Sequence, residues 1–155
     1  MRKPRVLKPK AKYHVTARAN RREMIFEAPI VKELFLGIMH TAKTKYRFQL
    51  FNFCIMGNHI HFLIQPGEKT SLSHLMQWLL SVFAVKYNKL HGYSGHVWYD
   101  RFKSSILEDI FHYLNAYIYI MWNPVRAGLA QKPTDYPYNG ITFMLKGQSE
   151  LFMPS

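Results

Sequence analysis

The stretch from residue 47 to residue 66 constrains the fold most, because it contains two strand patterns joined by a tight turn. Residues 47–56 read RFQLFNFCIM, a short run rich in aromatic side chains that is typical of a central strand. Gly57 and Asn58 follow with the residue types that form tight turns. Residues 59–65 then show the alternation of a strand, with apolar side chains at every even position, before a Pro-Gly pair ends the pattern. The stretch therefore predicts a β-hairpin.

The second strand of this hairpin carries His59 and His61 on one face. Successive side chains of a strand point to opposite faces, so residues two apart share a face. The opposite face is wholly apolar and suits a protein core, since it consists of Ile60, Phe62 and Ile64. Two imidazoles on one strand face favour a metal site. The alternative is that they are incidental polar residues of a strand.

Helical patterns flank the hairpin on both sides. Pro29 begins a helix that runs to about Lys45, with apolar residues at helical spacing: Ile30, Leu34, Phe35, Ile38 and Ala42. Residues 71–91 show a second, longer apolar stripe, and Gly92 follows as a stop signal. The hairpin is thus preceded by one helix and followed by another.

Two further strand patterns and a last helix complete the order of elements. Residues 12–20, KYHVTARAN, alternate as a strand, and residues 96–107, HVWYDRFKSSIL, indicate a fourth strand or a strand pair. A last helix begins near Asp109. The order β-α-β-β-α-β predicts an α+β fold of the ferredoxin-like type, an antiparallel sheet with helices on one face, plus a C-terminal helix. We expect a single domain over residues 1–155 with a basic arm at about 1–11, and the histidines on an open face of the sheet.

Residues 111–126, FHYLNAYIYIMWNPVR, combine two stripes at helical spacing. One is apolar and predicts a buried face: Phe111, Leu114, Ile118, Met121 and Val125. The other is polar: His112, Asn115, Tyr119, Asn123 and Arg126. Tyr113 and Tyr117 project to the flank and are interpreted as packing residues, which is also the commonest role of any helical tyrosine. Pro124 removes a helical hydrogen bond, so we expect a kink or an end at Asn123.

The chain carries a formal net charge of +12, and nine of its 21 basic residues lie in the first 22 positions. This excess favours a polyanionic partner, most often nucleic acid, although a merely basic protein with a solubilising tail is the alternative. The basic residues that we expect to contact DNA are Arg2, Lys3, Arg5, Lys12, Arg18, Arg21, Arg22, Arg101, Lys103 and Arg126. Cys54 is the only cysteine, which excludes an intramolecular disulfide and a thiolate cluster. With no secretory signal and no membrane-spanning run, we expect a cytoplasmic, nucleoid-associated protein and no membrane partner.

Four stretches together resemble the single-tyrosine HUH transposases, and most closely the REP-associated tyrosine transposases of bacteria. The stretches are YHVTARANRREMIF, MGNHIHFLI, GHVWYDRFKSSIL and YIYIMWNPVRAGL, and the resemblance runs from about Tyr13 to Pro137. A histidine pair in a strand is a weak signal by itself. Followed in the right order by Tyr-x-x-x-Asn-Pro-Val-Arg-Ala-Gly, it becomes a specific one.

The resemblance implies a metal-dependent enzyme that cleaves and rejoins single-stranded or hairpin DNA through a 5′-phosphotyrosine intermediate, as a monomer or a homodimer. It implies that His59 and His61 bind the metal ion, that Asn123 completes the metal site and that Tyr119 is the nucleophile. Mg²⁺ or Mn²⁺ suits two imidazoles and an amide oxygen. Tyrosine has a reference pKa of about 10, so its phenolate needs support, and the sequence identifies no base.

Two alternatives to this enzyme stay open from the sequence. The chain could be a catalytically silent nucleic-acid-binding module of the same fold, or a metal-dependent hydrolase without a covalent step. The first is disfavoured because all four residues of the implied site are present. Near the fourth strand, Trp98, Tyr99 and Phe102 stand beside Arg101 and Lys103, which suits the stacking of unpaired bases. Packing of an amphipathic strand on the sheet would give the same pattern.

Overall fold

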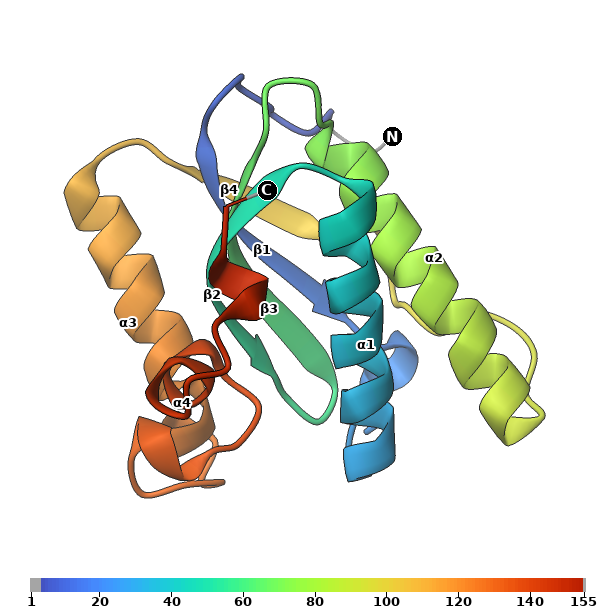
Figure 1. Cartoon of the computed structure of the whole chain (residues 1–155). Coiled ribbons are helices and arrows are strands. Elements are labelled where there is room, and N and C mark those ends of the chain that lie inside the picture. Colours follow the sequence, from blue (N-terminus) through green and yellow to red (C-terminus); the bar gives the residue numbers. More distant parts are fainter. Residues whose placement is uncertain (1–3, 155) are drawn as a thin grey trace.

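The computed structural model describes residues 4–154 and consists of one antiparallel sheet with helices on both faces (Figure 1). The strands are β1 (Lys12–Arg18), β2 (Phe48–Ile55), β3 (His59–Pro66) and β4 (Lys103–Leu107). The α-helices are α1 (Pro29–Lys45), α2 (Leu72–His91), α3 (Ile110–Arg126) and α4 (Gly140–Leu145). Short 3-10 turns occupy Asn20–Arg22, Pro133–Asp135 and Glu150–Phe152.

The sheet has the strand order β2-β3-β1-β4, and every neighbouring pair is antiparallel. The predicted hairpin is confirmed, because β2 and β3 pair across the Gly57-Asn58 turn and the Met56 amide donates to the His59 carbonyl over 2.9 Å. The predicted α+β, ferredoxin-like order of elements is confirmed as well. The outer strands of the sheet are β2 and β4, so the first strand of the chain lies in the middle of the sheet, beside the histidine strand.

Helices α1 and α2 cover one face of the sheet and enclose the main core. The apolar face of β3 predicted from the sequence, Ile60, Phe62 and Ile64, is buried here. Helix α2 ends as expected, since Gly92 adopts a left-handed φ of 67° at its C-terminus. One position of α1 was predicted wrongly: Ile30 is exposed, because the side of the helix that faces the core is formed by Val31, Phe35 and their helical neighbours.

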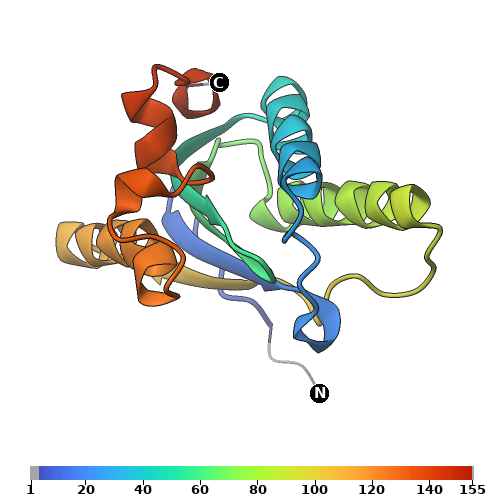
Figure 2. The same ribbon diagram turned by 90° about the horizontal axis from the view of Figure 1, so that it is seen from below.

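Helix α3 crosses the other face of the sheet, with α4 beside it (Figure 2). A second, smaller core lies beneath it and contains Cys54, Met56, Leu63, Ala116, Ile120 and Tyr136. The expectation that the histidine face would be open is therefore only partly right. The part of this face over β2 is covered by α3, while the part over β1 and β4 remains accessible.

The prediction of which side of α3 is buried is wrong. Phe111 is 73% exposed and Ile118 is 50% exposed, whereas Ala116, Ile120 and Asn123 are buried against the sheet. The sequence is apolar on most sides of this helix, so periodicity alone does not determine which side packs. The helix also continues through Pro124 to Arg126, without an end at Asn123.

The segment 96–107 contains a single strand, β4, where the sequence left a strand pair open. Trp98 precedes it and makes only an isolated bridge with Ala19. The reason is that the Trp98 side chain turns into the core, where its indole N–H donates to the Leu80 carbonyl over 2.9 Å. This anchors residues 96–102 against α2 and leaves the chain before Lys103 outside the sheet.

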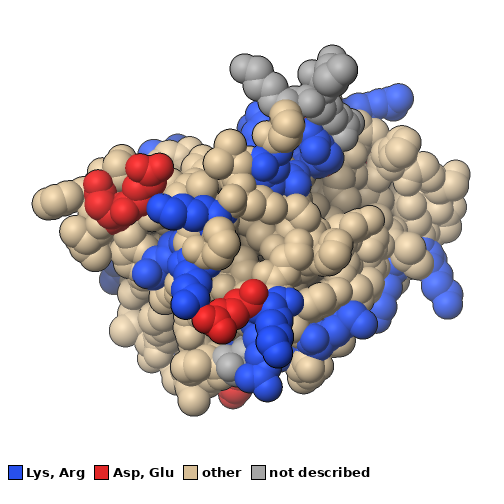
Figure 3. All heavy atoms as spheres, turned by 90° about the horizontal axis from the view of Figure 1, so that it is seen from above, with Lys and Arg blue, Asp and Glu red and all other residues tan. Residues whose placement is uncertain are grey.

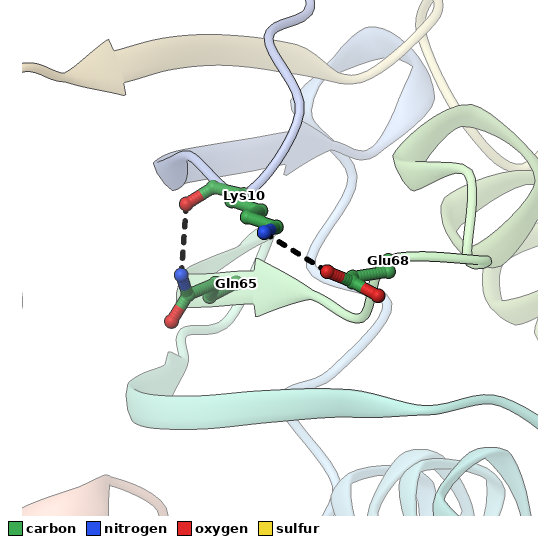
Figure 4. Close-up of polar contacts among 3 residues, drawn as sticks. All are labelled: Lys10, Gln65 and Glu68. Carbon is green, nitrogen blue, oxygen red and sulfur yellow. Dashed lines mark hydrogen bonds and ion pairs between the residues drawn. The ribbon is translucent and has the colours of Figure 1, made fainter.

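The N-terminal arm packs on the body of the protein from residue 5 onward. The Tyr13 hydroxyl bonds to the Lys8 carbonyl over 2.8 Å, and Arg5 donates to the Phe102 carbonyl over 2.9 Å. The Lys10 ammonium pairs with Glu68 at 2.9 Å, and the Gln65 amide donates to the Lys10 carbonyl (Figure 4). For residues 5–10, the alternative of a solubilising tail does not fit these contacts. Arg2 and Lys3 lie outside the described residues.

Candidate active site

The polar faces of β1, β3 and β4 meet in one cavity of about 360 Å³ beside α3. The strand register builds it, because Thr16 of β1 pairs with His61 on one side and Lys103 on the other. Arg18 lies opposite His59 in the same register. The residues that line the cavity are His14, Thr16, Arg18, His59, His61, Lys103, Ser105 and Tyr119.

Both predicted metal-binding histidines have their Nδ1 atoms engaged by neighbours. His59 Nδ1 lies 2.7 Å from Asn58 Oδ1, and His61 Nδ1 lies 3.0 Å from His14 Nε2 and 3.3 Å from Thr16 Oγ1. These contacts leave Nε2 as the available ring nitrogen of each imidazole. Histidines that bind metal ions are held in this way, with the second nitrogen bonded to a supporting group that fixes tautomer and orientation.

Helix α3 brings Asn123 to the available nitrogens. Its side-chain amide donates to His61 Nε2 over 3.1 Å and also hydrogen-bonds to His59. Asn123 is buried, as is His61, which is 5% exposed. The three residues implied as a metal site therefore lie in mutual contact, although they come from two elements that are about 60 residues apart in the chain.

The environment keeps these imidazoles neutral. Burial, followed by the neighbouring charges of His59, His14, Arg126 and Arg18, lowers the pKa of His61 to about 3. Burial also lowers the pKa of His14 and of His59, and for His59 the charge of Arg18 adds to the effect. A neutral imidazole is the form that binds a metal ion, so His59 and His61 are in the ligand form at neutral pH.

The donor set fits a weakly held divalent ion better than a structural metal. Within residues 4–154, no three His, Cys, Asp or Glu side chains form a metal-binding group. The set at hand is two imidazole nitrogens and one amide, which offers an oxygen in place of Nδ2 when it rotates by half a turn. Such a set leaves several coordination positions for water and phosphate oxygens and suits Mg²⁺ or Mn²⁺.

Tyr119 stands at the edge of the same cavity with its ring accessible. Its side chain is 48% exposed, and its ring centre lies 5.8 Å from that of His61 and 5.9 Å from that of His14. The Arg126 guanidinium lies 4.1 Å from the centre of the phenol ring. A positive charge at this position favours the approach of a phosphate to the phenol.

The other two tyrosines of α3 are placed differently. Tyr113 packs edge-on against Phe51 with ring centres 5.5 Å apart, and both Tyr113 and Tyr117 border the small core under the helix. Burial raises the pKa of each, and the neighbouring Tyr117 adds to the effect at Tyr113. The interpretation of these two residues as packing residues agrees with these contacts. Tyr119 is the tyrosine of α3 that lines the cavity.

The residues expected to contact DNA fall into separate groups on the surface. Arg18 and Lys103 line the site, and Arg126 lies over Tyr119. Arg21 and Arg22 follow β1 beside the hairpin turn, where Asn58 contacts the Arg22 carbonyl. Arg5 and Arg101 line a different cavity, beside α2, and Lys12 lies near the rings of Phe51 and Tyr113. Viewed from the end of the sheet where α2 begins, basic side chains spread over the surface and acidic ones form small groups (Figure 3).

Sequence reasoning missed the residues that support the histidines. His14 and Thr16 contact His61, and Asn58 contacts His59. The alternation of residues 12–18 does put His14, Thr16 and Arg18 on one face. This alternation does not indicate that β1 pairs with the histidine strand, nor does it give the register of the pairing. That pairing is what places His14 beside His61.

Comparisons with known proteins agree with this geometry. The sequence model of the family described as "Transposase IS200 like" matches residues 8–121, which is most of the chain. No curated protein matches the sequence significantly. Across residues 4–154, no helix combines the length and the apolar character that crossing a membrane requires.

Two solved structures show a similar fold. One is a REP-associated tyrosine transposase bound to a REP hairpin, with a TM-score of 0.78 and 16% identity, covering 100% of this chain and 92% of that one. Another is a putative transposase from Deinococcus radiodurans R1, with a TM-score of 0.53 and 16% identity, covering 76% of this chain and 95% of that one. At this identity the likeness concerns the fold. The match of the family model over residues 8–121 shows that the chain belongs to the IS200-like transposase family.

Proposed function

We propose that the protein is a divalent-metal-dependent transposase that cleaves and rejoins single-stranded DNA through a covalent bond to Tyr119. The observation that carries this proposal is the convergence of four groups at one cavity. The imidazoles of His59 and His61 and the accessible phenol of Tyr119 line this cavity, and the buried amide of Asn123 hydrogen-bonds to His61 Nε2. Membership in the IS200-like transposase family supports the same activity.

Tyr119 attacks the scissile phosphate through its phenol oxygen in this reaction. The new bond joins that oxygen to phosphorus, and the bond from phosphorus to the 3′ oxygen of the preceding nucleotide breaks. Because Tyr119 is half-exposed, its proton passes to water, and the departing oxygen takes a proton from water to become a 3′-hydroxyl. The phosphodiester energy is kept in the 5′-phosphotyrosine, so a 3′-hydroxyl reverses the step and rejoins the strand.

The remaining residues hold the reacting groups and reduce the negative charge at the phosphate. His59, His61 and Asn123 would hold Mg²⁺ or Mn²⁺, which supplies charge neutralisation at a nonbridging phosphate oxygen. Arg18 and Lys103 line the same cavity and add positive charge there. His14, Thr16 and Asn58 fix the orientation of the two imidazoles through their Nδ1 atoms.

Single-stranded or hairpin DNA is the proposed substrate. The site is a cavity on the face of the sheet beside α3, where a flexible strand can bring a backbone phosphate to Tyr119. The similar fold bound to a REP hairpin supports a substrate of this kind, as does the net charge of +12. The proposal holds for a monomer, and equally for a homodimer.

The test is the formation of a covalent protein–DNA adduct. Hairpin oligonucleotides with single-stranded flanks, labelled on the 3′ side, are incubated with the protein in Mg²⁺ or Mn²⁺ and separated on a denaturing gel. We expect a shifted band that requires the divalent ion and is lost in Tyr119→Phe. Binding without an adduct would favour a catalytically silent module, and unimpaired cleavage by Tyr119→Phe would favour a hydrolase.

A further inference from the structure

A larger cavity, of about 710 Å³, lies at the β4 edge of the sheet on the side of α2. It is enclosed by the first half of α2, the segment 96–102 and Arg5 of the N-terminal arm. Its lining includes Arg5, Gln77, Trp98, Tyr99, Arg101 and Phe102. The reaction proposed above uses none of these residues.

The lining combines aromatic rings and arginine guanidinium groups with polar side chains that can form hydrogen bonds. Trp98 is fixed by its bond to the Leu80 carbonyl, and the Arg5 guanidinium stacks on Phe102 with 3.5 Å to the ring centre. Arg5 is held there by its bonds to Ser73 Oγ and to the Phe102 carbonyl. Tyr99 is 68% exposed at the rim, where its ring is accessible from solvent.

This cavity is joined to the candidate active site by a few residues at the edge of the sheet. The Tyr99 amide donates to the carbonyl of Arg18 over 2.9 Å, and Arg18 lines the active-site cavity. Phe102 lines the larger cavity, while the next residue, Lys103, lines the active site. Because β4 is an outer strand, a flexible chain can pass around this edge from one cavity to the other.

We infer that the larger cavity binds an unpaired nucleobase of the DNA strand whose phosphate lies at Tyr119. This inference rests on the proposed function and extends it to a second contact with the same substrate. Tyr99 offers a stacking surface, the Gln77 amide and the Asp100 carboxylate can bond to base edges, and the two arginines suit the flanking phosphates. A phosphate alone would not use the aromatic surface.

The test uses photocrosslinking, which does not depend on catalysis. Oligothymidine carrying 5-iododeoxyuridine at alternate positions is irradiated with the Tyr119→Phe protein, and the crosslinked peptides are mapped by mass spectrometry. We expect crosslinks in the segment 96–102, at Tyr99 or Trp98. Tyr99→Ala should remove the Tyr99 crosslink and weaken binding of fluorescein-labelled oligothymidine by about tenfold in anisotropy titrations.

Two further variants make the test specific. Gln77→Ala removes an exposed amide from the cavity wall without touching the core, and we expect it to weaken binding as well. Tyr93→Ala is the matched control, because Tyr93 is an exposed tyrosine of the α2–β4 connection that does not line the cavity. Equal binding by the Tyr99, Gln77 and Tyr93 variants, with crosslinks only elsewhere, would overturn the inference. Crosslinks at Tyr99, together with a wild-type protein that forms no covalent adduct with the hairpin substrate, would keep this base site and refute the proposed reaction.

Discussion

His14 offers a sensitive test of how the site is organised, because it contacts His61, a proposed metal-binding residue, and is not itself proposed to bind the ion. When His61 Nε2 faces a metal ion, its Nδ1 carries the proton and donates to His14 Nε2 at 3.0 Å. Thr16 Oγ1 is the other partner of that nitrogen, at 3.3 Å. His14→Ala therefore removes the shorter of the two contacts that orient the His61 ring.

The expected loss follows from what such supporting contacts contribute. Removing the partner of a metal-binding histidine weakens metal affinity by about 10- to 100-fold, which is about 1.4 to 2.8 kcal/mol. Thr16→Val removes the longer contact and should cost less. His14→Gln should recover most of the loss, because its side-chain amide oxygen can take the place of Nε2 as the hydrogen-bond acceptor.

The assay is a titration with Mn²⁺ in which the paramagnetic resonance signal reports the free ion. His40→Ala is the control, since His40 is an exposed histidine of α1 on the opposite face of the sheet. Cleavage by His14→Ala should recover at high Mn²⁺ concentration, which a folding defect would not allow. An unchanged dissociation constant for Mn²⁺ in His14→Ala would refute the assignment of His14 as a positioning residue.

Three other predictions concern the pH dependence of stability, the salt dependence of DNA binding and the cleavage activity. In a chelating buffer, the free energy of unfolding should fall as the pH drops below about 6.5, because the pKa of His61 is about 3 in the folded protein and the unfolded chain binds the proton first. His61→Asn should lower the slope of this free energy against pH by about 1.4 kcal/mol per pH unit, and an equal slope in the variant would contradict the prediction. Arg18→Ala combined with Lys103→Ala should lower the slope of log K against log salt for single-stranded DNA by about 1.4 if each contacts one phosphate, whereas Lys86→Ala on the outer side of α2 should leave it unchanged. His59→Ala should abolish cleavage while circular dichroism shows a folded protein, and unfolding of this variant would indicate a structural role.

The sequence was sufficient where a pattern is local. The Gly57-Asn58 turn and the alternation after it predict the β2–β3 hairpin, and that alternation also assigns His59 and His61 to the face opposite the core. Helices α1 and α2 follow from apolar spacing together with Pro29 at the start of one and Gly92 at the end of the other. The order of these elements then gives the fold class.

The sequence was insufficient where a contact depends on how distant elements meet. Helix α3 is apolar on several sides, so the stripe of Phe111 and Ile118 predicted a buried face, although the helix packs through Ala116 and Ile120. The choice is made by the shape of the sheet surface over Cys54 and Leu63, which no local pattern contains. The place of His14 beside His61 depends in the same way on the pairing of β1 with β3.

The identity of the tyrosine that bonds to DNA tests the proposed function most directly. The protein is incubated with the hairpin substrate and Mn²⁺, the adduct is digested with protease and nuclease, and the modified peptide is sequenced by mass spectrometry. We predict a nucleotide joined through its 5′ phosphate to Tyr119, because this tyrosine alone among those of α3 lines the cavity with His59 and His61. An adduct on Tyr117 that persists in Tyr119→Phe would contradict the account, since Tyr117 borders the small core beneath the helix.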